Sequence, residues 1–356
     1  MNYRPENRVS RPPGEAPEKS SVVEQGMPPE ACPLRLVLLM RYSSLLRTVL
    51  GVGAVAVATL VSVRPAAADL LSGFKESRVM RQHLAGRLTK TQYPATSLGE
   101  SRTVFVYTPP GFDPGAARRY PVLVLLHGTP GDPLDWLYRG GVHSAIDHAI
   151  VSGYLPPCIV AIPDGHGPFY RGGSEWANDI KGRCAMETAI THDLAQFLEG
   201  KYHAAADPGL WAIGGLSEGG YGAANLTVRH PERFRNALIL SGDLQVSDDW
   251  GDASDVFGDG AAERSANSPI EQIKRVEPDI RKNLRFYVAV GADDDDALVS
   301  QCVGFTCVAR SVGATVQLAR DPGRHNWDFW SAHLKDGLGL LSQWWKQAEQ
   351  HPTTHG

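Results

Sequence analysis

Cysteine, clusters of basic residues and long uncharged stretches are all scarce in this chain. Only five of the 356 residues are cysteine, and no two of them form a C-x-x-C pair, which argues against a zinc site. The net charge is −4 and no run of Lys and Arg is present, so the electrostatic footprint of a nucleic-acid-binding protein is missing. We therefore expect no metal, no cofactor and no nucleic-acid partner.

Residues 1–68 differ in composition from the rest of the chain. Residues 1–39 are rich in proline and poor in large apolar side chains, and we expect them to be disordered or to precede the true start codon at Met40. Residues 40–68 contain two arginines, then the apolar stretch 49–63, then three alanines, which is the order of a secretory signal peptide. Cleavage is expected after Ala68.

The apolar stretch 49–63 is short for a membrane helix, since a bilayer requires about 20 such residues. The sequence thus predicts a secreted or periplasmic protein with no stable membrane span after cleavage, and an uncleaved membrane anchor is the alternative. Residues 69–350 are expected to form one domain. An even number of cysteines in an exported domain permits disulfides in three pairings among Cys158, Cys184, Cys302 and Cys307.

The order of apolar segments predicts an α/β fold with a mostly parallel sheet. Residues 87–95 and 102–110 alternate polar and apolar side chains with no helix between them, which predicts an antiparallel opening hairpin. Continuous apolar runs at 120–128 and 156–165 predict strands covered on both faces. Further strands are expected at 210–215, 236–242, 284–292 and 314–320. Helices are expected at 142–152, 185–201, 295–311 and 329–347, and before Arg229. The Asp- and Gly-rich segment 242–267 is expected to be a surface excursion.

Residues 215–219 fit the pattern G-x-S-x-G, with Ser217 at its centre. The pattern is common in a glycine-rich chain, so its position decides its meaning. It lies between a predicted strand and a predicted helix, where a sharp turn would expose the serine hydroxyl. A Cβ at Gly215 or Gly219 would collide with the neighbouring strand or helix. This position predicts that Ser217 is a nucleophile.

A serine nucleophile needs a base to take its proton and an acid to orient that base. In a strand–elbow–helix architecture the chain order is serine, acid, histidine. His325 lies in a loop between the last predicted strand and the last helix, and we expect it to be the base. The acid is expected on the loop after 284–292, at Asp294, with Asp293 as the alternative. Two backbone N–H groups should stabilise the oxyanion, from Glu218 and from Thr129, with Gly128 as the alternative to Thr129.

Together these segments resemble the enterochelin-esterase and esterase D group of the α/β-hydrolase superfamily, which also contains the mycobacterial mycolyltransferases. The segments that carry the resemblance are 104–113, 120–128, Asp135-Trp136, 214–234, 241–243 and 325–330. The resemblance implies a mostly parallel sheet with antiparallel N-terminal strands, helices on both faces, and a triad of Ser217, an acid near 294 and His325. It also implies a loop on the substrate side at 174–179, so Trp176 and Asn178 are expected to bind substrate.

Trp136 and Trp327 are also expected to border the pocket. Glu218 departs from the family pattern, because relatives often carry a neutral residue there. The expected function is an exported serine esterase that hydrolyses a small-molecule, lipid or glycan ester through an acyl-enzyme. An acyltransferase to a sugar or lipid hydroxyl is the alternative, and a non-catalytic glycan- or lipid-binding module is the second. The sequence leaves the natural ester and the oligomeric state open.

Overall fold

The computed structural model describes residues 64–247, 250 and 253–351. The predicted extension 1–39 lies outside these residues, as does nearly all of the predicted signal peptide 40–68. The last residues of that predicted signal begin helix α1 (Arg64–Met80). Among the described residues, no helix combines the length and the apolar character that a membrane crossing requires.

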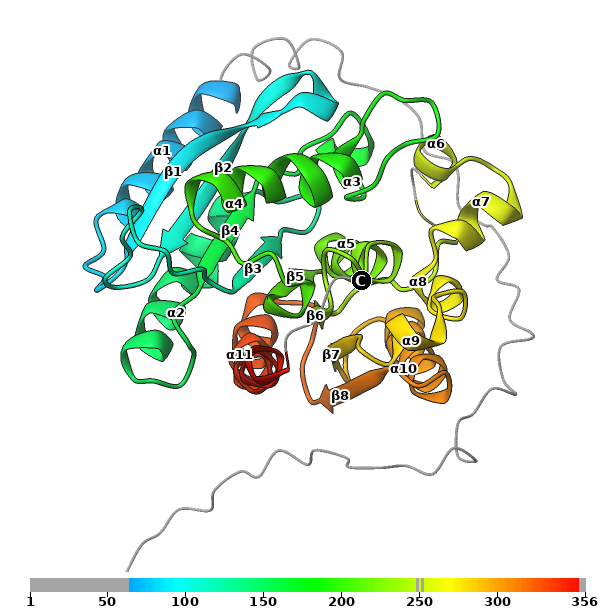
Figure 1. Cartoon of the computed structure of the whole chain (residues 1–356). Coiled ribbons are helices and arrows are strands. Elements are labelled where there is room, and N and C mark those ends of the chain that lie inside the picture. Colours follow the sequence, from blue (N-terminus) through cyan, green and yellow to red (C-terminus); the bar gives the residue numbers. More distant parts are fainter. Residues whose placement is uncertain (1–63, 248–249, 251–252, 352–356) are drawn as a thin grey trace, which may run out of the picture.

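One eight-stranded sheet organises the fold, with the strand order β1-β2-β4-β3-β5-β6-β7-β8 (Figure 1). The strands β1 and β2 form an antiparallel hairpin, β2 pairs antiparallel with β4, and all the other pairs are parallel. The strands are β1 (Arg87–Ala95), β2 (Glu100–Thr108), β3 (Val122–Leu126), β4 (Ile159–Pro163), β5 (Trp211–Leu216), β6 (Asn236–Leu240), β7 (Arg285–Gly291) and β8 (Thr315–Asp321). The predicted fold class is thereby confirmed.

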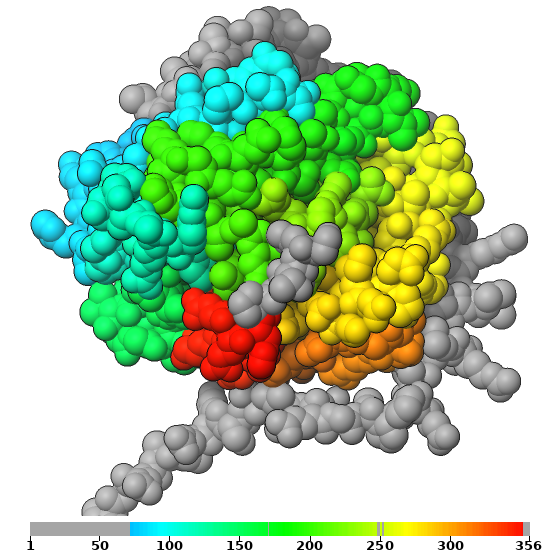
Figure 2. All heavy atoms as spheres, viewed as in Figure 1, coloured from blue at the N-terminus to red at the C-terminus, as the bar shows by residue number. Residues whose placement is uncertain are grey.

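Helices cover both faces of this sheet, because its central strands are apolar on both sides. On one face lie α2 (Val142–Val151) and α11 (Trp327–Gln350); on the other lie α4 (Ala195–Lys201), α5 (Glu218–Arg229) and α10 (Asp296–Ser311) (Figure 1). The space-filling view shows the end of α11, in red, beside the orange and yellow surface of the later part of the chain (Figure 2).

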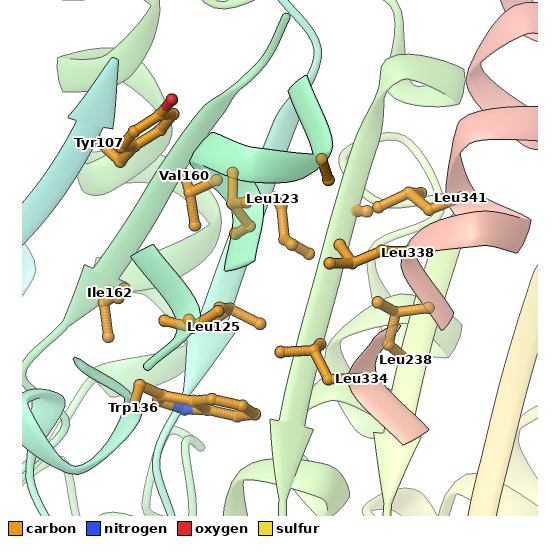
Figure 3. Close-up of a cluster of buried hydrophobic side chains, with 14 of the residues drawn as sticks. Tyr107, Leu123, Leu125, Trp136, Val160, Ile162, Leu238, Leu334, Leu338 and Leu341 are labelled. Atoms are coloured by element: carbon orange, nitrogen blue, oxygen red, sulfur yellow. The ribbon is translucent and has the colours of Figure 1, made fainter. Parts of the chain in front are cut away.

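The longest helix, α11, attaches to the sheet through side chains at helical spacing. Figure 3 shows Leu334, Leu338 and Leu341 projecting from α11 toward Leu238 of β6, and all four are buried. Positions i, i+4 and i+7 lie on one face of a helix, so this leucine stripe fixes the rotation of α11. The start of the same helix is thereby held at the carboxyl end of the sheet, directly after His325.

The remaining elements are short and connect this framework. They are η2 (Thr96–Leu98), η3 (Asp135–Arg139), η4 (Tyr170–Gly172), α3 (Met186–Thr188), η5 (Ala189–Leu194), η6 (Pro208–Leu210), α6 (Ala253–Phe257), α7 (Ala261–Ala266), α8 (Pro269–Gln272) and α9 (Pro278–Arg281).

The structure corrects one expectation from the sequence and resolves one question that the sequence left open. Segment 242–267 is not only a surface excursion, because Val246, Val256 and Phe257 are buried against Tyr221 of α5. None of the three pairings that the sequence permits among Cys158, Cys184, Cys302 and Cys307 forms, because Cys158, Cys184 and Cys302 are free and buried. They could not have paired with one another, because each belongs to a different apolar cluster of the core. Each instead packs as a small apolar side chain.

Candidate active site

Ser217 occupies a strained turn between β5 and α5. Its backbone has φ 55° and ψ −124°, a region that non-glycine residues rarely adopt. The turn is possible because a Cβ at Gly215 would lie 2.0 Å from the Gly219 oxygen, and one at Gly219 would lie 2.3 Å from the Leu126 oxygen. Within residues 211–228, Ser217 alone is not buried. The turn therefore presents the hydroxyl at the carboxyl end of the sheet.

Asp294 and His325 meet at the same end of the sheet. The imidazole Nδ1 of His325 lies 3.2 Å from Oδ2 of Asp294, and Oδ1 accepts a hydrogen bond of 2.9 Å from the Asp295 N–H. The side chain of Asp294 is 3% exposed and that of His325 is 38% exposed, so the carboxylate is enclosed and the ring faces outward. Asp293 is exposed, and its backbone N–H donates to the Gly323 oxygen at 2.9 Å. Of the two candidate acids, the structure brings Asp294 to the histidine.

Ser217 and His325 line one cavity of about 120 Å³. Its other lining residues include Gly128 and Thr129 from the loop after β3, with Trp327 and Trp330 from the start of α11. Within the described part of the chain, no hydrogen bond joins the Ser217 hydroxyl to the imidazole. Such contacts are commonly long in unliganded enzymes and shorten when substrate binds.

The N-terminus of α5 points toward this cavity. Glu218 is the first residue of the helix, so its backbone N–H has no acceptor within the helix. The helix dipole adds partial positive charge at the same point. Gly128 lies opposite: a Cβ there would come within 3.1 Å of the Ser217 Cβ. The backbone of the loop after β3 thus faces the first turn of α5 across the serine, as two donors to one oxyanion require.

The carboxylate of Glu218 is bound by the backbone at residues 174 and 175. It is 8% exposed in the whole residue, and Oε1 accepts hydrogen bonds from the N–H groups of Ser174 (3.2 Å) and Glu175 (2.8 Å). The loop that donates these two hydrogen bonds has positive φ angles at Arg171, Glu175 and Trp176. The departure from the family pattern therefore has a local use, because the carboxylate holds a strained loop beside the first turn of α5.

His127 joins two loops and is not part of the cavity lining. Its Nδ1 donates to the Gly128 oxygen and its Nε2 accepts from the Gly165 N–H, both at 3.0 Å. Burial lowers its pKa to about 4, which keeps the ring neutral. Atoms of His127, Asp164 and His166 lie within 4.8 Å of one another, as in a metal site. However, both ring nitrogens of His127 are engaged, so it has no lone pair to offer a metal.

The four expected substrate-binding residues lie in different places. Trp327 lines the cavity. Trp136 lies behind it, fully buried, with its Nε1 donating to the Leu126 oxygen at 3.0 Å and its ring 5.4 Å from that of Trp327. Trp330 lines the cavity as well, with its ring 4.8 Å from that of His325, a role that the sequence pattern did not predict.

Trp176 and Asn178 are not brought to the cavity. Trp176 is fully buried, and its Nε1 donates to the His127 oxygen at 3.1 Å. Asn178 is exposed, and its amide exchanges two hydrogen bonds with Thr188. The expected substrate contact of Trp176 is therefore corrected to a structural contact, and Asn178 lies outside the residues that line this cavity. Arg139 and Asp135, which the sequence analysis did not propose as ligand contacts, line the cavity instead.

Curated proteins with similar sequences include esterases. An uncharacterized protein of Corynebacterium glutamicum is 33% identical over 157 residues, which cover 44% of this chain and 36% of that protein. An endo-1,4-beta-xylanase/feruloyl esterase of Xylanibacter ruminicola is 27% identical over 198 residues, which cover 53% of this chain and 27% of that protein. The chain spans about a third of the length of the first of these relatives and about a quarter of the second.

The fold is shared with solved esterases. A ferulic acid esterase superposes with a TM-score of 0.65 at 23% identity, covering 74% of this chain and all of that one. The sequence model of the Esterase family, described as "Putative esterase", matches residues 95–341. This match confirms the resemblance derived from the motifs, and the chain belongs to the Esterase family.

Proposed function

We propose that this chain is a serine esterase that hydrolyses carboxylic esters with Ser217, His325 and Asp294 as its catalytic triad. The observation that carries the proposal is the convergence of the three side chains at one end of the sheet. Ser217 projects from a strained turn, His325 shares its cavity, and Asp294 lies 3.2 Å from the far nitrogen of the ring. Membership of the Esterase family supports the same reaction.

The first half-reaction forms an acyl-enzyme. Ser217 Oγ attacks the ester carbonyl carbon while Nε2 of His325 takes the hydroxyl proton. The carbonyl oxygen becomes an oxyanion that accepts hydrogen bonds from the N–H groups of Glu218 and Thr129. Asp294 holds the ring by Nδ1 and stabilises the imidazolium. The C–O bond to the alcohol then breaks, and the imidazolium gives its proton to the departing oxygen.

The second half-reaction returns the free enzyme. Water loses a proton to His325 as it attacks the acyl carbon, and the same two N–H groups stabilise the second oxyanion. Ser217 Oγ departs and regains a proton from the ring, and the carboxylic acid is released. The rings of Trp327 and Trp330 form an apolar wall of the cavity, which favours a small, flat acyl group.

The test of this function uses a fluorophosphonate probe, which reacts only with an activated serine. The wild-type protein should be labelled and Ser217→Ala should not, whereas Ser300→Ala, an exposed serine on α10, should be labelled like the wild type. A folded wild-type protein that stays unlabelled would contradict the proposal and leave a binding module as the remaining function. Steady-state rates against aryl esters of increasing acyl length would then define the acyl preference.

We also propose that the protein is exported. The support is the composition of residues 40–68, which follow the order of a signal peptide. N-terminal sequencing of protein recovered from the medium or the periplasm should begin at Asp69. A protein that stays in the cytoplasm with its first residues intact would contradict export, without affecting the proposed chemistry.

A further inference from the structure

Asp243 lies at the same end of the sheet as the proposed triad. It follows β6, whose neighbour is β7, and the two strands run parallel with Leu240 opposite Ala289. The Ser241 N–H continues this pairing with a hydrogen bond of 2.8 Å to the Ala289 oxygen. Because neighbouring parallel strands end at one edge, the residues that follow β6 and β7 are delivered to the same place. These residues are Asp243 and Asp294.

The turn that carries Asp243 is tightly fixed. Ser241 is fully buried with φ 47°, and its Oγ accepts a hydrogen bond of 3.2 Å from Nε1 of Trp330. The Trp330 ring in turn packs edge-on against the His325 ring. Gly242 presses against α5, where a Cβ would lie 2.7 Å from the Gly220 carbonyl carbon. A strained turn held on two sides leaves Asp243 little freedom to move.

The carboxyl group of Asp243 has an unusual environment. It forms no hydrogen bond or ion pair with any residue that the structure describes, and the charged groups that face it are His325, Asp295 and Asp294, with the Cys302 thiol nearby. Burial raises the pKa of Asp243 to about 6; attraction to His325 opposes this rise, and repulsion from Asp295 and Asp294 adds to it. The group therefore gains its charge close to neutral pH.

We propose that Asp243 is a positioning residue for His325, a second carboxylate that stabilises the protonated ring and partly replaces Asp294 when that residue is lost. The inference rests on the proposed triad. His325 acquires positive charge only after it takes the Ser217 proton, so a carboxylate nearby stabilises the transition state more than the resting enzyme. Asp243 accepts no proton in the reaction, and its effect is electrostatic.

The experiment compares four variants over pH 5 to 8 with an activated aryl ester. These are Asp243→Asn, Asp294→Asn, the double variant, and Asp293→Asn as a matched control on an exposed aspartate of the same loop. Asp243→Asn should equal the wild type near pH 5, where Asp243 is protonated, and should lose about threefold to tenfold in kcat as pH rises through 6. Asp293→Asn should follow the wild type throughout.

The Asp294→Asn background reveals whether Asp243 can substitute. In that background, Asp243→Asn should lower kcat by a factor at least ten times larger than in the wild type, because no carboxylate then remains to stabilise the protonated ring. Asp243→Glu keeps the charge and should show the wild-type pH dependence of kcat. This variant tests the proposal even if Asp243→Asn misfolds. The proposal would be overturned if Asp243→Asn lowered kcat equally at every pH and if the kcat losses of the two single variants simply multiplied in the double variant. Loss of the triad chemistry itself would appear separately, as a Ser217→Ala variant that retains full activity.

Discussion

Gly219 gives the sharpest test of the strained turn at Ser217. In Gly219→Ala the new Cβ would lie 2.3 Å from the Leu126 oxygen and 2.6 Å from the His127 oxygen. Both atoms belong to the main chain at the end of β3, so neither can rotate away, and α5 must move from the strand. Overpacking of this kind costs about 1–3 kcal/mol, and displacement of backbone places this variant near 3 kcal/mol.

The expected loss can be measured in two ways. For a domain of this size about 3 kcal/mol corresponds to a fall in Tm of roughly 6–10 °C in a thermal melt. The shift of α5 also moves the Glu218 N–H, and loss of one oxyanion donor lowers kcat by about 10²- to 10³-fold. Gly200→Ala in α4 is the control, since its Cβ meets open space. Alanine favours a helix, so this control should keep full activity and an equal or higher Tm. Wild-type Tm and kcat in Gly219→Ala would refute the steric argument.

Three further outcomes are expected. Asp294→Asn should lower kcat by about 10³- to 10⁴-fold while Asp293→Asn stays within about twofold, and equal losses would contradict the choice of acid. Leu338→Ala should cost about 3 kcal/mol in urea unfolding, because Leu338 is 2% exposed; a cost near zero would contradict the leucine contact. Burial lowers the pKa of His230, but its hydrogen bonds with Glu187 and Glu232 outweigh burial and raise it to about 9. The protonated His230 therefore stabilises the folded chain fully below about pH 6.5, and this contribution is lost as pH rises to about 9. Over that range the free energy of unfolding should decline less in His230→Gln than in the wild type.

The sheet and the turn at Ser217 could be predicted because their physical causes are local. Strands covered on both faces need uninterrupted apolar runs, and such runs occur at 122–126, 159–163 and 286–291. The turn needs glycine two residues before and two residues after the serine, and the five residues 215–219 already show this pattern. The catalytic roles of these residues remain predictions, which the probe experiment tests.

Other features depend on contacts between distant segments and leave no trace in the sequence pattern. Four consecutive aspartates do not reveal which one faces His325; that depends on the Asp293 N–H bonding to the Gly323 oxygen, which orients the loop. Trp176 lies in a segment that the sequence places on the substrate side, yet its indole N–H donates a hydrogen bond to the His127 oxygen inside the core. Its burial follows from tertiary contact alone. Asp243, which we propose as a second carboxylate for His325, lies in a segment that carries the family resemblance, but its place at the same edge as Asp294 depends on the pairing of β6 with β7.

The neutral ring of His127 sets a lower limit to the pH that the loops around the serine tolerate. A histidine in the unfolded chain titrates near pH 6.5, whereas His127 in the folded chain titrates near pH 4. Between these values the unfolded chain takes up a proton that the folded chain refuses, so stability falls with decreasing pH. Once the ring is protonated, its Nε2–H would oppose the Gly165 N–H, donor against donor. Mild acid should therefore break the hydrogen bond between His127 and Gly165 before it unfolds the sheet. Faster hydrogen exchange of the Gly165 amide at low pH would reveal this local opening.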